Sequence, residues 1–151
     1  MKLSCAAILT GESDTPAATP RASTSIGDRI RVLLVEDSTE TATLVRIYLR
    51  DEEDSFQIEW APNLMEAMGR LGEPGISVVL LDLGLPELSG YRSYRAIQAG
   101  TRYKPPVVIF TSDDSVLSRA LTMEFGAADY LLKGEVTPLE LRNALRRAVL
   151  G

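Results

Sequence analysis

Four apolar runs in this sequence each end in side chains that could do chemistry. The residues at those ends are Glu36-Asp37, Asp82, Thr111-Ser112 and Lys133. Together they supply three carboxylates, two hydroxyls and one ammonium, in a chain that has no histidine and a single cysteine. Three carboxylates that lie close repel one another and favour a bound cation. Because oxygen ligands without thiolate or imidazole suit hard cations, the set predicts a site for Mg²⁺ or Mn²⁺.

The run Val78–Leu81 is the centre of the expected fold. It is apolar without alternation, which is typical of a strand buried on both faces of a parallel sheet. Asp82 follows it directly, at the place where open α/β sheets bind their ligands. Four more strands are predicted at Ile30–Val35, Phe56–Trp60, Pro106–Phe110 and Asp129–Leu132. The carboxyl ends of parallel strands share one edge, so we expect the candidate residues to meet there.

Helical spacing follows each predicted strand. The expected buried faces are Leu44, Ile47 and Tyr48; Leu64, Ala67, Met68 and Leu71; Tyr94 and Ile97; Leu117, Ala120, Leu121 and Phe125; and Leu141, Ala144, Leu145 and Ala148. The expected caps are Ser38, Asn63, Ser89 and Thr137. Asn63 with Glu66, and Thr137 with Glu140, each have the spacing of a capping box. Strands that alternate with helices predict an α/β fold, a doubly wound parallel sheet with helices on both faces.

The rest of the composition narrows the class of protein. The 151 residues carry a net charge of −5, which disfavours direct nucleic-acid binding. No apolar run is long enough to span a membrane, and one cysteine permits a reducing compartment, so we expect a cytoplasmic protein. Residues 1–28 are rich in Ser, Thr and Pro and predict a disordered tail before one domain at residues 29–151.

From about Arg31 to Leu150 the sequence resembles the receiver domain of two-component response regulators. The resemblance is carried by the acidic pair, by Asp82 with Pro86 four residues on, by Thr111, and by Gly126-Ala127-Ala128-Asp129-Tyr130 ahead of Lys133. It implies a flavodoxin-like, CheY-like fold with five strands in the order 2-1-3-4-5 and five helices.

The resemblance also implies the chemistry. Asp82 would be the phosphoacceptor, taking a phosphoryl group from a histidine kinase or a histidine phosphotransfer protein. Glu36, Asp37, Asp82 and the backbone carbonyl of Gly84 would hold Mg²⁺, or Mn²⁺ in its place. Lys133 would pair with Asp82 and then with the phosphoryl oxygens. The protein would thus be a signalling switch and not an enzyme with a turnover substrate.

The switch itself is implied by two residues. Thr111 would hydrogen-bond the phosphoryl group, and Tyr130 would swing inward as Thr111 moves. The signal would pass to a downstream protein partner or output domain, with no membrane contact and with a homodimer left open. Trp60 at its strand end is interpreted as a packing residue.

The sequence departs from the family pattern at three places. Gly134 follows Lys133 where the family usually has a proline after a cis bond, so we expect a trans bond or an altered loop. Leu85 replaces the usual methionine and should matter little. Asp113, two residues after Thr111, is expected to add negative charge beside the site.

Three other functions share this architecture. A flavodoxin-like cofactor binder would need a glycine- and hydroxyl-rich loop after the first strand, where Glu36-Asp37 would repel phosphate. An aspartate-dependent phosphohydrolase would need a second Asp two residues after Asp82, where Gly84 stands. A receiver-like docking module that works without phosphorylation remains open.

Overall fold

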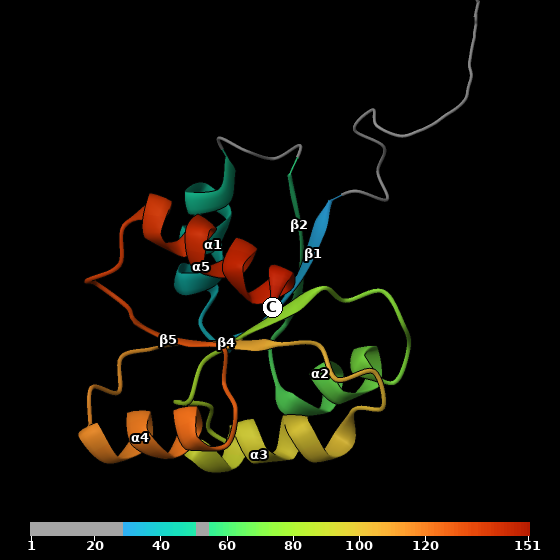
Figure 1. Cartoon of the computed structure of the whole chain (residues 1–151), viewed down its shortest axis with the longest axis vertical. Coiled ribbons are helices and arrows are strands. Elements are labelled where there is room, and N and C mark those ends of the chain that lie inside the picture. The colour runs from blue at the N-terminus through green and yellow to red at the C-terminus, as the bar shows by residue number, and fades with distance from the viewer. Residues whose placement is uncertain (1–28, 51–54) are drawn as a thin grey trace, which may run out of the picture.

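The computed structural model of this chain describes residues 29–50 and 55–151. The predicted N-terminal tail lies outside the described residues. In the described part, strands and helices alternate throughout the chain (Figure 1). The strands are β1 (Ile30–Val35), β2 (Phe56–Ala61), β3 (Val78–Leu81), β4 (Val107–Thr111) and β5 (Asp129–Leu132). The helices are α1 (Thr39–Arg50), α2 (Leu64–Leu71), α3 (Tyr91–Gly100), α4 (Val116–Glu124) and α5 (Pro138–Leu150).

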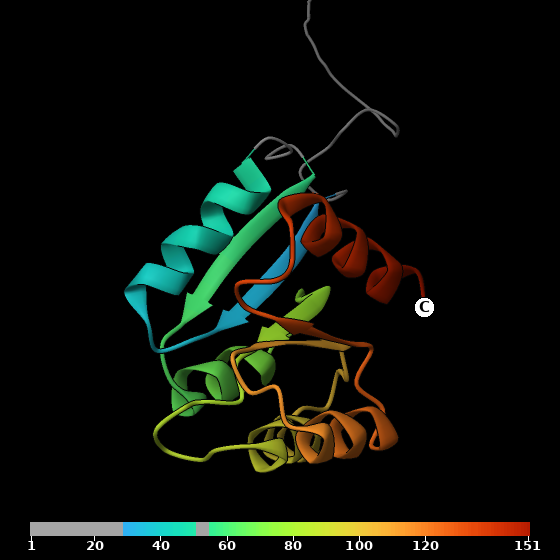
Figure 2. The same ribbon diagram turned by 90° about the vertical axis from the view of Figure 1, so that its left-hand side faces the viewer.

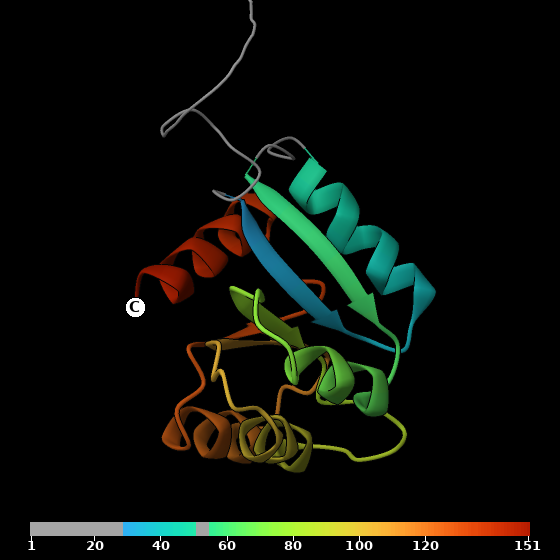
Figure 3. The same ribbon diagram turned by 90° about the vertical axis from the view of Figure 1, so that its right-hand side faces the viewer.

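The strands form one parallel sheet in the order β2-β1-β3-β4-β5, as expected. Strand β3 lies at its centre, and all four of its residues are fully buried. Helices α1 and α5 cover one face, while α2, α3 and α4 cover the other (Figures 1 and 2). The arrowheads of β1 and β2 point to the same edge (Figure 3), so the residues that follow the strands are gathered there.

Two apolar cores hold this sandwich together, because successive strand residues face opposite sides of the sheet. Leu33, Leu81 and Ile109 belong to the core under α2 and α3, and Leu80 and Phe110 belong to the core under α1 and α5. A strand that is buried on both faces cannot slip by one residue without moving every side chain to the wrong core. The register that places Asp82 is therefore firmly set.

Local signals fix most helix starts as predicted. The Ser38 hydroxyl accepts from the Thr41 N–H, and Asn63 Oδ1 accepts from the Glu66 N–H at 2.9 Å. Thr137 and Glu140 form the full predicted capping box at the start of α5. The predicted cap at Ser89 is wrong, because α3 begins after Gly90 and has no side-chain cap.

The predicted buried faces of α1 and α4 are partly wrong. In α1 the buried residues are Ala42, Val45 and Leu49, while Ile47 is 46% exposed. At 3.6 residues per turn, the buried residues lie on the side of the helix opposite Ile47. In α4, only Thr122 is buried among the helix residues, and Leu117 is 68% exposed. This helix therefore touches the sheet lightly and leaves apolar side chains in contact with solvent.

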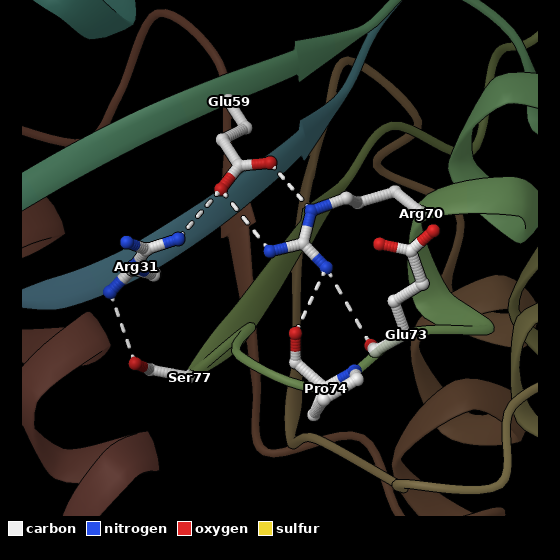
Figure 4. A network of polar contacts seen from close by, with 6 residues as sticks. All are labelled: Arg31, Glu59, Arg70, Glu73, Pro74 and Ser77. Carbon is white, nitrogen blue, oxygen red and sulfur yellow. Dashed lines mark hydrogen bonds and ion pairs between the residues drawn. The ribbon is translucent and has the colours of Figure 1, made fainter.

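A polar network closes the edge of the sheet near β2 (Figure 4). The Arg70 guanidinium of α2 grips both carboxylate oxygens of Glu59 on β2, at 2.6 and 3.3 Å. It also donates to the backbone carbonyl of Pro74, and Arg31 of β1 reaches the same carboxylate at 3.4 Å. These contacts tie α2 and the turn that follows it to the edge of the sheet.

No helix among the described residues is long and apolar enough to cross a membrane.

Candidate functional site

The candidate residues meet at the carboxyl edge of the sheet, as their positions after the strands predict. Glu36 and Asp37 follow β1, Asp82 follows β3, Thr111 ends β4 and Lys133 follows β5. The backbone holds these ends in register, because the Asp82 N–H donates to the Val35 carbonyl and the Lys133 N–H donates to the Thr111 carbonyl. The sheet thus fixes where each functional side chain starts.

The Lys133 ammonium lies between two buried carboxylates. Its Nζ is 2.7 Å from Glu36 Oε1 and 3.4 Å from Asp82 Oδ2. The second oxygen of each carboxylate is held by a backbone N–H: Glu36 Oε2 accepts from Ser38 and Asp82 Oδ1 accepts from Gly84. Both carboxylates are therefore rigidly placed. In the part of the chain that the structure describes, no backbone group holds the Asp82 oxygen that is nearest Lys133.

Burial and nearby charges change the electrostatics of the site. Glu36 is 1% exposed, and burial raises the pKa of its carboxyl above the usual value. The hydrogen bond and charge of Lys133 act in the opposite direction, while the nearby Asp82 charge adds to the rise. One ammonium opposes three carboxylates here, so the cluster keeps an excess of negative charge.

The cluster fits a hard divalent cation. Glu36, Asp37 and Asp82 each offer a carboxylate oxygen, and these oxygens lie within 4.8 Å of one another. Asp37 is exposed to solvent while the other two are buried, so an ion could keep several of its waters on that side. A Cβ on Gly84 would lie 3.5 Å from both Asp82 carboxylate oxygens, and its absence leaves that space open. The donor set and the open space suit Mg²⁺.

The loop after β4 joins Thr111 to Tyr130. Thr111 Oγ1 accepts from the Asp113 N–H at 3.2 Å, and the Tyr130 hydroxyl donates to the Asp113 carbonyl at 2.6 Å. Tyr130 is 4% exposed, so the structure has it turned inward. The Asp113 carboxylate is engaged by the first turn of α4, where it accepts from the Ser115 N–H and the Ser118 hydroxyl. These bonds lower the pKa of Asp113.

Two residues at the site were not predicted to act there. The Trp60 indole N–H donates to the Glu36 carbonyl at 2.6 Å, although the sequence analysis gave Trp60 only a packing role. Glu87, in the loop after Asp82, accepts from the Leu64 N–H at the start of α2. The signal for Trp60 is its position at the end of the strand beside β1. Glu87 has no comparable signal, because its contact depends on how the loop folds back.

Because of the Tyr130 hydroxyl, we expect the free energy of unfolding to depend on pH in the alkaline range. Burial, with the Asp113 and Asp114 charges, raises its pKa to about 12 from an ordinary value of 10.0. A group with a raised pKa in the folded state contributes stability below pH 10, and that contribution is lost as the pH rises toward 12. In urea unfolding, the free energy of unfolding of the wild type should fall more steeply over this window than that of Tyr130→Phe. Equal slopes would contradict the prediction.

The chain is similar to known signalling proteins over most of its length. The family model of the response regulator receiver domain matches residues 32–146. The transcriptional regulatory protein TrcR of Mycobacterium tuberculosis is 33% identical over 132 residues, which are 85% of this chain and 50% of TrcR. PcoR of Escherichia coli, another transcriptional regulatory protein, is 31% identical over 78% of this chain and 52% of its own length. The chain therefore spans about half the length of these curated relatives.

Solved structures of receiver domains are similar to the fold of this chain. The receiver domain of a putative LuxO repressor protein from Vibrio parahaemolyticus superposes with a TM-score of 0.69, at 32% identity, over 81% of this chain and 94% of that one. The BeF3-activated N-terminal receiver domain of RstA from Klebsiella pneumoniae also gives 0.69, at 30% identity, over 80% and 99%. With the family model matching most of the chain, these comparisons confirm the CheY-like fold, and the chain belongs to the response regulator receiver domain family.

Proposed function

We propose that Asp82 is the phosphoacceptor of a Mg²⁺-dependent receiver. The observation that carries the proposal is the placement of a buried carboxylate beside both Lys133 and an acidic pair, with one oxygen held by the Gly84 N–H. Phosphoryl transfer asks mainly for positioning and for neutralised charge, and this arrangement supplies both.

The reaction follows from the two oxygens of Asp82. Oδ2 attacks the phosphorus of a phosphohistidine, the P–N bond breaks as the P–O bond forms, and the imidazole leaves. The Gly84 N–H holds Oδ1 and so fixes the plane of the carboxylate. Lys133, released in part from Asp82, turns its ammonium to the phosphoryl oxygens. A Mg²⁺ ion held by Glu36, Asp37, Asp82 and the Gly84 carbonyl would neutralise the remaining charge.

Thr111 and Tyr130 are the proposed switch. The Thr111 hydroxyl lies at the end of β4 and would hydrogen-bond the phosphoryl group. Its bond to the Asp113 N–H and the bond from Tyr130 to the Asp113 carbonyl link this movement to the start of α4. A phosphoryl group that makes contacts in only one arrangement shifts the population toward that arrangement.

The proposed partners are those of the family. Response regulators work with histidine kinases, so the donor here is expected to be a histidine kinase or a histidine phosphotransfer protein. TrcR and PcoR are named as transcriptional regulatory proteins. The net charge of −5 favours output through a downstream protein or output domain over direct nucleic-acid contact. A cytoplasmic location remains a prediction.

Intact mass after incubation with acetyl phosphate tests the proposal. We expect one phosphoryl adduct on the wild type with Mg²⁺, and none with EDTA or on Asp82→Asn. Asp129→Asn is the matched control, because Asp129 lies at the start of β5, on the opposite edge of the sheet, and should keep the adduct.

An adduct that persists on Asp82→Asn would contradict the assignment of the acceptor. If no adduct forms on the wild type, a second test is to add beryllofluoride and measure the amide chemical shifts. Shifts at Thr111 and Tyr130 would support a working switch that rejects this small donor. A protein that responds to neither reagent would be the docking module that works without phosphorylation.

A further inference from the structure

Residues at the end of β2 hydrogen-bond the backbone on both sides of Glu36, including the peptide group between Glu36 and Asp37. The Glu36 N–H donates to the Ala61 carbonyl at 3.1 Å, and the Glu36 carbonyl accepts the Trp60 indole N–H at 2.6 Å. β1 and β2 are neighbours in the sheet (Figure 2). Leu34 is opposite Trp60 in the register of the two strands, so the indole reaches past the end of β1 to the loop beyond it. The end of β2 thus fixes the backbone on both sides of the Glu36 side chain.

Asp37 depends on that backbone more than its neighbour does. The Glu36 carboxylate is fixed by Lys133 and by the Ser38 N–H. Asp37 is exposed, and its carboxylate must be aimed at the cation by the main chain that carries it. The carbonyl that Trp60 holds belongs to the peptide plane that leads into Asp37, so a rotation of this plane would move the Asp37 carboxylate out of the cluster.

We infer that Trp60 is a positioning residue for the cation site, acting through its indole N–H on the Glu36–Asp37 peptide. The inference rests on the proposed Mg²⁺ site. The ring is itself oriented, because it is half-buried against the core under α1 and α5 and the Arg46 guanidinium of α1 lies 5.9 Å from its centre. Groups that orient metal ligands in this way commonly change metal affinity by 10- to 100-fold when they are removed.

Trp60→Phe separates this role from packing, since phenylalanine keeps an aromatic ring and loses the N–H. We expect calorimetric titration with MgCl₂ to show binding about tenfold weaker than in the wild type. Tyr94→Phe is the matched control: it also removes one aromatic donor to a backbone carbonyl, that of Phe125, in a bond that joins α3 to the end of α4. Tyr94→Phe should leave Mg²⁺ binding unchanged, while it lowers thermal stability by about as much as Trp60→Phe does.

The outcomes distinguish this inference from the proposed function. Binding by the wild type that is lost in Asp37→Asn establishes the site. If Trp60→Phe then binds within twofold of the wild type, Trp60 is a packing residue and the inference is overturned, while the proposed function stands. If the wild type binds no Mg²⁺, the cation site itself is overturned, and the inference falls with it.

The wild type offers a second measurement that does not depend on how well the variant folds. The chain has one tryptophan, so its indole emission comes from Trp60 alone. Because the indole is bonded to the loop that carries the ligands, titration with MgCl₂ should change the emission with the same midpoint as the calorimetry. An emission that stays constant through saturation would overturn the inference.

Discussion

Replacing Lys133 with methionine should destabilise the fold by about 3 kcal/mol in the absence of Mg²⁺. The ammonium lies 2.7 Å from Glu36, whose side chain is 1% exposed, and 3.4 Å from Asp82, whose side chain is 8% exposed. Without it, two buried carboxylates face each other with no counter-charge. Removing one partner of a buried ion pair is severe because the other charge is left unpaired in a medium of low dielectric.

Urea unfolding with EDTA and with MgCl₂ measures this effect and its cause. A cation that binds the folded state stabilises it, and it should do so more strongly in Lys133→Met than in the wild type, narrowing the gap between them. Lys104→Met is the matched control, because the exposed Lys104 ammonium donates only to the Gln98 carbonyl among the contacts described. A loss below about 1 kcal/mol, with no response to Mg²⁺, would contradict the electrostatic account.

A second substitution identifies which charge is responsible. Glu36→Gln keeps the shape of the side chain and removes the carboxylate that is closest to Lys133. If unpaired charge is the cause, Glu36→Gln in the Lys133→Met background should recover most of the lost stability. If lost packing of the lysine stem were the cause, the double variant would be no more stable than Lys133→Met.

The placement of the site was predictable from sequence because it depends on strand ends. A run such as Val78–Leu81 has to lie in the centre of a sheet, and the residue after it has to lie at the ligand-binding edge. Glu36, Asp37, Thr111 and Lys133 follow by the same logic. Their roles in phosphoryl transfer remain proposals, because position alone does not report reactivity.

The helix faces and the loop contacts were less predictable. In α1, apolar residues lie on both sides of the helix, so periodicity does not choose between Val45 and Ile47. The Trp60 indole bonds the Glu36 carbonyl and the Tyr130 hydroxyl bonds the Asp113 carbonyl. Both carbonyls belong to loops, which have no sequence period. Such contacts emerge only when the elements are assembled.

Gly134→Pro is the second large effect we expect, and its sign is opposite to what the family pattern suggests. The family pattern that the resemblance implies has proline after this lysine, and a proline that fits a loop usually stabilises it. Here Gly134 has a φ of +85°, whereas the proline ring fixes φ near −65°. The Glu135 N–H donates to the Leu132 carbonyl, so Gly134 is the third residue of a tight turn, where a positive φ favours glycine.

The proline variant should therefore lose more than about 2 kcal/mol of stability and bind Mg²⁺ more weakly, because the turn that sets the direction of Lys133 has to change. Gly134→Ala is the graded control: a Cβ there meets nothing within 4 Å, so its expected loss of about 1 kcal/mol reflects backbone strain alone. Urea unfolding and calorimetry on the two variants measure both effects. A proline variant as stable as the wild type, with Lys133 still able to support phosphorylation, would contradict the prediction. It would mean that the loop has a second conformation, in which proline fits and the lysine still reaches Asp82.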